Sequence, residues 1–224
     1  MKRVVLALLL VSTSAYAADD PLAAAFRAAF GKPQSVVLKK QGQLKENVKY
    51  TPGDLVNAPF GPVLLSPGEV ESASHINSGK LAIVYLKPAA KGFDVVKRFV
   101  PAAEVGSFGK IVDWSVSRSF GDLPIVSVNG AGNWQGYSCS TTTLLELTPE
   151  GPRHLATVPM TYDNSGAVGA GGKLMQINGR IENIQPGKSF DVVYFGSKGF
   201  TEHYVRKDNV YMLASGGQSR VQRC

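Results

Sequence analysis

Glycine and proline recur so often along this chain that long helices are disfavoured. Its 224 residues include 24 Gly and 13 Pro, and the short segments between them are rich in Val, Ile, Thr, Tyr and Phe, which favour strands. Because Pro presets φ and Gly supplies positive φ, clusters of the two mark turns. The clearest turn signals are Thr51-Pro52-Gly53-Asp54, Ser66-Pro67-Gly68, Pro149-Glu150-Gly151-Pro152, Asp163-Asn164-Ser165-Gly166 and Gln185-Pro186-Gly187-Lys188.

The runs between these turns predict an antiparallel all-β fold. Three predicted hairpins look alike, and their turn glycines, Gly92, Gly151 and Gly199, are 59 and 48 residues apart. Since propeller blades span about 40–50 residues, the candidate architectures are a two-layer sandwich, a strongly bent sheet and a partial propeller-like array. The predicted strands are Ser35–Lys39, Val63–Leu65, Leu81–Lys87, Phe93–Val100, Trp114–Phe120, Ile125–Asn129, Thr142–Leu147, His154–Val158, Leu174–Asn178, Phe190–Phe195, Phe200–Arg206 and Val210–Leu213.

One short helix is predicted near the N-terminus. Asp20 is a good N-cap, Pro21 suits the first helical position, and Gly31 suits the stop. Apolar residues recur every fourth position in between, which gives a stripe that we expect to dock onto the sheet.

The first 17 residues have the order of a secretory signal peptide: two basic residues, a short apolar run and Ala15-Tyr16-Ala17. The apolar run is too short to span a bilayer, and no later stretch reaches the required ~20 apolar residues. We therefore expect an exported protein, periplasmic in the first place and secreted as the alternative. The predicted division is a signal peptide (1–17), a helix and linker (18–34), a single all-β domain (35–214) and a C-terminal tail (215–224).

The charge of the mature chain is mildly basic. It keeps 22 Lys plus Arg against 17 Asp plus Glu, a net charge of +5. Part of the excess lies at Lys39 and Lys40, followed by Lys45 and Lys49, without the dense block typical of nucleic-acid binding. A solvated basic face is the simpler interpretation, although Lys39 and Lys40 are candidates for weak attraction to envelope anions.

Cys139 and Cys224 are the only cysteines. An oxidising compartment favours a disulfide between them, which would fasten the polar C-terminal tail. The alternative is a Cys139 nucleophile with His154 or His203 as its base, although the residues around Cys139 match no local nucleophile signature.

No cofactor or metal is predicted. The three histidines are too far apart in sequence for usual zinc spacing. The segment 130–136 departs from the dinucleotide-binding fingerprint, and we predict that it forms a glycine-rich turn or bulge. The segment 169–174 lacks the hydroxyl residue of a phosphate-binding loop. Asp163-Asn164-Ser165-Gly166 reads as a turn rather than the start of a calcium loop.

Two functions remain open. The first is a non-catalytic envelope protein of the inhibitor, immunity or assembly-accessory type, which binds a protein or an envelope polysaccharide through its loops. Its candidate binding residues are Trp134, Gln135 and Tyr137, because large aromatics beside glycine suit ring stacking or anchoring in a pocket. The alternative is a secreted hydrolase of cell-wall glycan or peptide that brings distant carboxylates together. Its candidate carboxylates are Asp54, Glu69, Glu71, Asp113 and Asp122.

Overall fold

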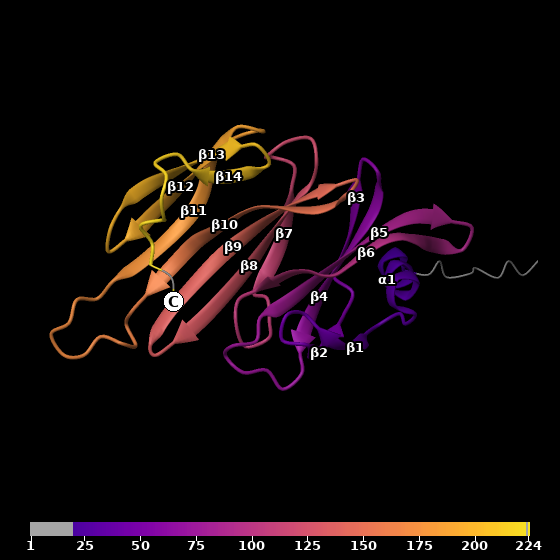
Figure 1. The fold of residues 1–224 in the computed structure, drawn as a ribbon, viewed down its shortest axis with the longest axis horizontal. Coiled ribbons are helices and arrows are strands. Elements are labelled where there is room, and N and C mark those ends of the chain that lie inside the picture. Colours follow the sequence, from indigo (N-terminus) through magenta and orange to yellow (C-terminus); the bar gives the residue numbers. More distant parts are fainter. Residues whose placement is uncertain (1–19, 223) are drawn as a thin grey trace, which may run out of the picture.

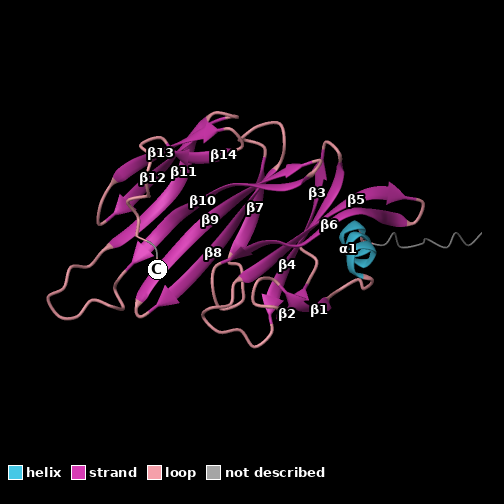
Figure 2. Ribbon diagram, viewed as in Figure 1, coloured by secondary structure: helices cyan, strands magenta, loops and turns pink. Residues whose placement is uncertain are grey.

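The structure, a computed structural model, describes residues 20–222 and 224 and consists of one helix and two antiparallel sheets (Figure 1). The predicted signal peptide lies outside the described residues. Helix α1 is Pro21–Phe30, and the remaining elements are strands and loops (Figure 2). No helix among the described residues is long and apolar enough to cross a membrane. The predicted all-β class with one N-terminal helix is confirmed.

The first sheet has the strand order β1-β2-β4-β5-β6, and β3 pairs separately with β4. The second sheet is a meander in which every strand pairs with its neighbours in sequence, from β7 to β14. Strands of the first sheet are β1 (Val36–Gln41), β2 (Glu46–Tyr50), β3 (Asp54–Ala58), β4 (Gly61–Val70), β5 (Gly79–Ala89) and β6 (Gly92–Val105). Strands of the second are β7 (Asp113–Ser117), β8 (Ile125–Trp134), β9 (Tyr137–Thr148), β10 (Gly151–Asp163), β11 (Gln176–Gln185), β12 (Ser189–Gly196), β13 (Phe200–Lys207) and β14 (Val210–Leu213).

Three apolar layers hold these elements together. Alternation along β4 and β5 sends Leu64 and Val84 toward α1, and Leu65 and Ile83 toward β8 and β9 of the second sheet. The third layer fills the inside of the second sheet, which curls into a half-barrel (Figure 1). Because β5 lies between two layers, all its residues from Gly79 to Leu86 are buried.

Helix α1 has the predicted caps and docking. Leu22 N–H donates to the Asp20 side chain at 3.1 Å, and Gly31 closes the helix in the left-handed conformation at φ 77°. Phe26 is fully buried against the first sheet, and the Phe30 ring stacks on Tyr50 with ring centroids 5.8 Å apart. The helix therefore closes one face of the first sheet.

The strands differ from the prediction in several places. All twelve predicted runs fall on strands, but β2 and β3 were missed and β7 stops at Ser117 instead of Phe120. The predicted turn Ser66-Pro67-Gly68 is wrong, because these residues lie inside β4. Gly68 is needed there because a Cβ would lie 2.6 Å from the buried Tyr50 ring. The three similar hairpins belong to two continuous sheets, so the propeller-like arrangement is not the one formed.

One buried ion cluster, Lys80 with Glu46 and Glu104, underlies the β1–β2 hairpin. The Lys80 side chain is 1% exposed, and its Nζ lies 2.6 Å from Glu104 Oε2 and 2.8 Å from Glu46 Oε2. Burial raises the pKa of Glu46, but hydrogen bonds from Lys80 and Asn77 outweigh it, so this pKa lies below its ordinary value of 4.5. Asn77 donates to Glu46 at 2.7 Å, which ties the loop of residues 71–78 to the Lys80 cluster.

Candidate functional site

The site is built on the hairpin that joins β8 and β9. Trp134 pairs directly with Tyr137, and the two-residue turn between them has positive φ at both Gln135 (49°) and Gly136 (85°). That conformation is the type I′ turn, whose twist matches paired strands. A Cβ on Gly136 would lie 2.6 Å from the backbone nitrogen of Ala167, so the hairpin tip is packed against a neighbouring loop. Trp134 and Tyr137 therefore project from a well-anchored turn.

The glycines before Trp134 lie within β8 and not in the turn or bulge that the sequence predicted. Strand β8 outruns its partner β7, whose last pair is Asp113 with Asn129. Beyond that pair Ser107 N–H donates to Ala131 O at 2.9 Å, and the backbone of Gly106 lies against Gly130. A side chain at Gly130 would collide with that backbone, which explains the glycine. The edge of β8 here is partly open.

Aromatic rings form a row across this end of the second sheet. The His75 ring lies against Trp134 with centroids 4.5 Å apart, and Tyr137 lies 6.2 Å from Tyr162. Trp134 is 49% exposed and Tyr137 37% exposed, so neither ring belongs to the core. The contact with His75 comes from the first half of the chain, 59 residues away, through the loop that Asn77 ties down.

The last residues of the chain, Gln218–Gln222 and Cys224, form a strap over the same region. The predicted disulfide is confirmed: Cys139 is bonded to Cys224, with the two Cα atoms 5.8 Å apart. The strap has further anchors that the sequence interpretation missed. Arg220 N–H donates to the buried Glu202 at 2.6 Å, its guanidinium lies 4.0 Å from the Phe200 ring centroid, and Val221 is 2% exposed.

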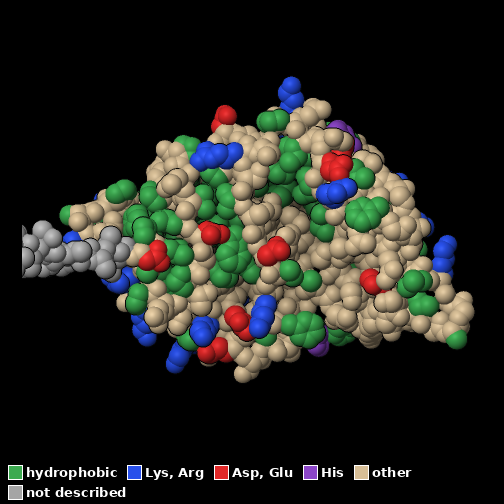
Figure 3. Space-filling view, turned by 180° about the vertical axis from the view of Figure 1, so that it is seen from behind, with side chains coloured by type: hydrophobic (Ala, Val, Ile, Leu, Met, Phe, Trp, Pro, Cys, Tyr) green, Lys and Arg blue, Asp and Glu red, His purple; other side chains and the backbone are tan. Residues whose placement is uncertain are grey.

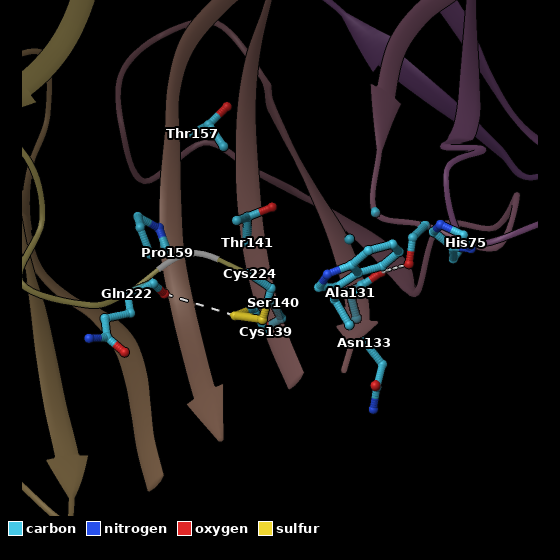
Figure 4. A pocket seen from close by; sticks show the side chains of 15 residues that line it. His75, Ala131, Asn133, Cys139, Ser140, Thr141, Thr157, Pro159, Gln222 and Cys224 are labelled. Carbon is cyan, nitrogen blue, oxygen red and sulfur yellow. Dashed lines mark hydrogen bonds between the residues drawn. A yellow bond between two sulfur atoms is a disulfide. The ribbon is translucent and has the colours of Figure 1, made fainter. Parts of the chain in front are cut away.

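Two adjoining cavities flank Trp134. Their volumes are about 510 and 660 Å³, within the range of roughly 300–1,000 Å³ typical of small-molecule sites. Trp134, Gln222 and Cys224 line both. In the first cavity, Thr141, Thr157 and Pro159 stand on one side and His75 on the other (Figure 4). The second cavity adds Gln135, Tyr137, Tyr162, Gln218 and Val221. We call the lining of the two cavities the Trp134 surface.

The Trp134 surface has no formally charged side chain among the described residues, since no Asp, Glu, Lys or Arg lines either cavity. Burial, together with the neighbouring Tyr137, raises the pKa of the Tyr162 phenol, which stays neutral at physiological pH. The polar groups are hydroxyls and amides. Within the described part of the chain, the side chains of Gln135, Gln218 and Gln222 make no hydrogen bond. These amides are free to bind a ligand.

The structure brings only some of the candidate binding residues together. Trp134, Gln135 and Tyr137 share the second cavity, whereas Lys39 and Lys40 are exposed on β1 and line neither cavity. On the face seen in Figure 3, basic and acidic side chains are intermixed and form no block of one sign. His75, Tyr162 and Gln222 were missed, because they are distant in sequence. The predicted Cys139–Cys224 bond was the one signal that could have placed Gln222 here.

The hypothesis that Cys139 is a nucleophile is wrong, because its sulfur atom is bonded to Cys224. His154 Nε2 lies 2.9 Å from Thr157 Oγ1, and His203 Nδ1 lies 2.6 Å from Asp191 Oδ1. Hydrogen bonds from His203 and then Asn183 lower the pKa of Asp191. These contacts occupy both histidines in local pairs.

The candidate hydrolytic carboxylates do not converge. Across five cavities in the described part of the chain, Glu69 is the one member of this set that contributes to a lining. Asp54 accepts from the Trp114 indole at 2.6 Å, and Glu69 pairs with Lys110 at 2.8 Å. The described residues contain no group of three or more His, Cys, Asp or Glu side chains placed to hold a metal ion. Asp163 accepts from Ser165 N–H at 2.7 Å, which is the predicted turn.

The chain matches no family model, no curated protein and no solved structure.

Proposed function

We propose that this protein is an exported, non-catalytic envelope protein that binds a macromolecule through the Trp134 surface. The observation that carries the proposal is the half-exposed Trp134 ring, fixed by His75 and standing between two cavities. Large rings that stay exposed beside cavities are typical of binding sites, because a folded chain has no need to hold them there.

The rigidity of the surroundings also supports binding. A type I′ turn, a disulfide and the Arg220–Glu202 contact hold the ring and the strap in place. Groups that are already ordered lose little entropy when a partner binds. The disulfide is compatible with an oxidising, extracytoplasmic compartment.

The test is capture of partners from an envelope extract by immobilised wild-type protein and by two matched variants. Trp134→Ala removes the proposed anchor. Phe195→Ala removes a ring of nearly equal exposure, 48% against 49%, that lines neither cavity. We expect the partner on wild type and Phe195→Ala but not on Trp134→Ala.

The melting temperatures of both variants should lie within a few degrees of wild type, because exposed rings contribute little to folding. Capture that is equal for all three proteins, or absent for all three, would overturn the proposal. Partner that is degraded during incubation with wild type would contradict the non-catalytic part.

A further inference from the structure

The chemistry of the Trp134 surface indicates a class of ligand. Given the proposed function, we propose that the ligand is an uncharged polysaccharide chain that lies across Trp134, with sugar units in both cavities. Four properties of the described residues carry this inference: the charge of the lining, the ring, the free amides and the connection between the cavities.

Among the described residues, the lining offers a charged ligand no Asp, Glu, Lys or Arg side chain as a partner. Within residues 20–222 and 224, no Asp, Glu, Lys or Arg side chain lines either cavity. A charge moved from water into such a site loses hydration without gaining a side-chain counter-ion. None of the Lys and Arg residues that the structure describes lines this surface. An acidic polysaccharide, a nucleic acid or a phosphorylated lipid would therefore find no Lys or Arg partner among the described lining residues.

The aromatic groups suit a sugar ring. Trp134 is a large flat ring held by its contact with His75, at a centroid distance of 4.5 Å, and Tyr137 stands opposite it in the hairpin register. Aromatic faces are apolar surfaces with low conformational entropy. The faces of pyranose rings expose C–H groups and stack on such surfaces, while their hydroxyls point outward.

The free amides suit those hydroxyls. Each Gln side chain carries both donors and acceptors, as does each sugar hydroxyl. Gln135, Gln218 and Gln222 surround the second cavity without hydrogen bonds in the described part of the chain. Thr141 adds a hydroxyl in the first cavity that is likewise without a described partner. The lining thus combines stacking with uncharged hydrogen bonding.

The connection between the cavities indicates a chain rather than a single sugar. Trp134 and Gln222 line both cavities, so a ligand that stacks on Trp134 has room on either side. A polymer with a repeating neutral unit can place consecutive units in the two cavities, whereas a monosaccharide fills only one.

The first experiment identifies the class of the captured material. The envelope extract is divided and treated with periodate, which cleaves the vicinal diols of sugars, or with a protease, and is then offered to wild type and Trp134→Ala. We expect capture by wild type to survive the protease and to be lost after periodate. The captured material should pass through an anion exchanger, because it is neutral.

The outcomes separate this inference from the proposed function. Trp134-dependent capture that is lost after protease and survives periodate would mean that the partner is a protein. This result would overturn the inference of a glycan ligand and would leave the proposed function unchanged. Captured material that is retained on the anion exchanger is anionic, and it would overturn the inference that the ligand is neutral. Capture that does not depend on Trp134 overturns the proposed function itself.

The second experiment probes the surface with an array of immobilised neutral and acidic oligosaccharides. Trp134→Ala should weaken binding of the preferred neutral glycan at least about tenfold, and Gln222→Ala about three- to tenfold. Trp134→Phe, which keeps a planar ring, should recover part of the affinity. Thr141→Val and Tyr137→Ala, one in each cavity, should each weaken binding of the oligomer.

Ionic strength gives an independent readout. Binding of an uncharged glycan should change less than about twofold between low and high salt, because a neutral ligand forms no ion pair that salt could screen. Preference for acidic glycans, or affinity that falls steeply with salt, would overturn the inference. In a Trp114→Phe background Trp134 is the sole tryptophan, so saturable change in its emission on adding the glycan in solution locates the binding directly.

Discussion

The Trp134 surface and the β1–β2 hairpin were both predicted to bind partners, and they differ in where their charges lie. The hairpin exposes Lys39 and Lys40 on an open strand, and it reaches a cavity of about 220 Å³ only through Lys49. The Trp134 surface exposes rings and amides over two larger cavities, and no Asp, Glu, Lys or Arg side chain that the structure describes lines it. Exposed charge by itself is typical of a solvated face, whereas an exposed ring beside a cavity is typical of a ligand site.

The two regions are also held in different ways. Under the hairpin, the stabilising contacts are buried ion pairs of Lys80 with Glu46 and Glu104. At the Trp134 surface a disulfide and apolar burial fix the strap. Changes in charge or pH should therefore act on the first region, and reduction on the second.

The largest expected effect is that of Lys80→Ala. This change leaves two carboxylates near each other without their buried cation, so we expect a loss of about 3–5 kcal/mol in the free energy of unfolding. Urea unfolding monitored by circular dichroism measures it. Lys110→Ala breaks an ion pair of similar length, 2.8 Å, whose side chains are 65% and 57% exposed. That control should cost less than about 1 kcal/mol, and equal effects of the two substitutions would show that burial does not decide the outcome.

Reduction of the disulfide should have the next largest effect. The bond joins residues 85 apart, for which loop entropy gives up to about 4 kcal/mol. We expect about 2–4 kcal/mol for Cys139→Ser with Cys224→Ser, because Val221 and the Arg220–Glu202 contact still hold part of the strap in the folded variant. Urea unfolding of the double variant measures the loss. An unchanged free energy of unfolding would mean that these contacts fix the strap without the covalent bond.

The strands show how much of the fold could be predicted from the sequence. The alternation of apolar residues and the turn signals located twelve strands, because each of those has a clear apolar run. Strand β2 was missed because its run, Glu46–Tyr50, is charged and buries only Val48 and Tyr50. Pro67 and Gly68 resemble a turn locally, yet long-range pairing of Pro67 with Leu81 keeps them in β4.

The candidate site shows the same limit. Trp134, Gln135 and Tyr137 are close in sequence, so local reasoning found them. His75 and Tyr162 reach the Trp134 surface only through loop docking and strand pairing between distant segments. Sequence patterns specify which residues form strands, but they carry little information about which strand ends meet.

A pH titration tests how much the ionised Glu46 contributes to stability. The pKa of Glu46 is lowered in the folded state, so its contribution to stability is fully present above the unfolded value of about 4.5 and is lost as pH falls through the folded pKa. Wild type should therefore lose more of its free energy of unfolding between pH 6 and pH 3 than Glu46→Gln. Urea midpoints measured over this range decide it, and parallel curves for the two proteins would contradict the assignment to Glu46.

The smallest expected effect is that of Lys39→Gln combined with Lys40→Gln. Both side chains are exposed, and neither lines a cavity of the Trp134 surface, so the free energy of unfolding should stay within about 0.5 kcal/mol of wild type. Capture of the envelope partner should also be unchanged, because neither lysine lines the Trp134 surface and a neutral ligand does not respond to their charge. Measuring both quantities matters, since the basic segment was the second binding candidate in the sequence, after Trp134. Lost capture with unchanged stability would assign the binding role to the basic hairpin instead of the Trp134 ring.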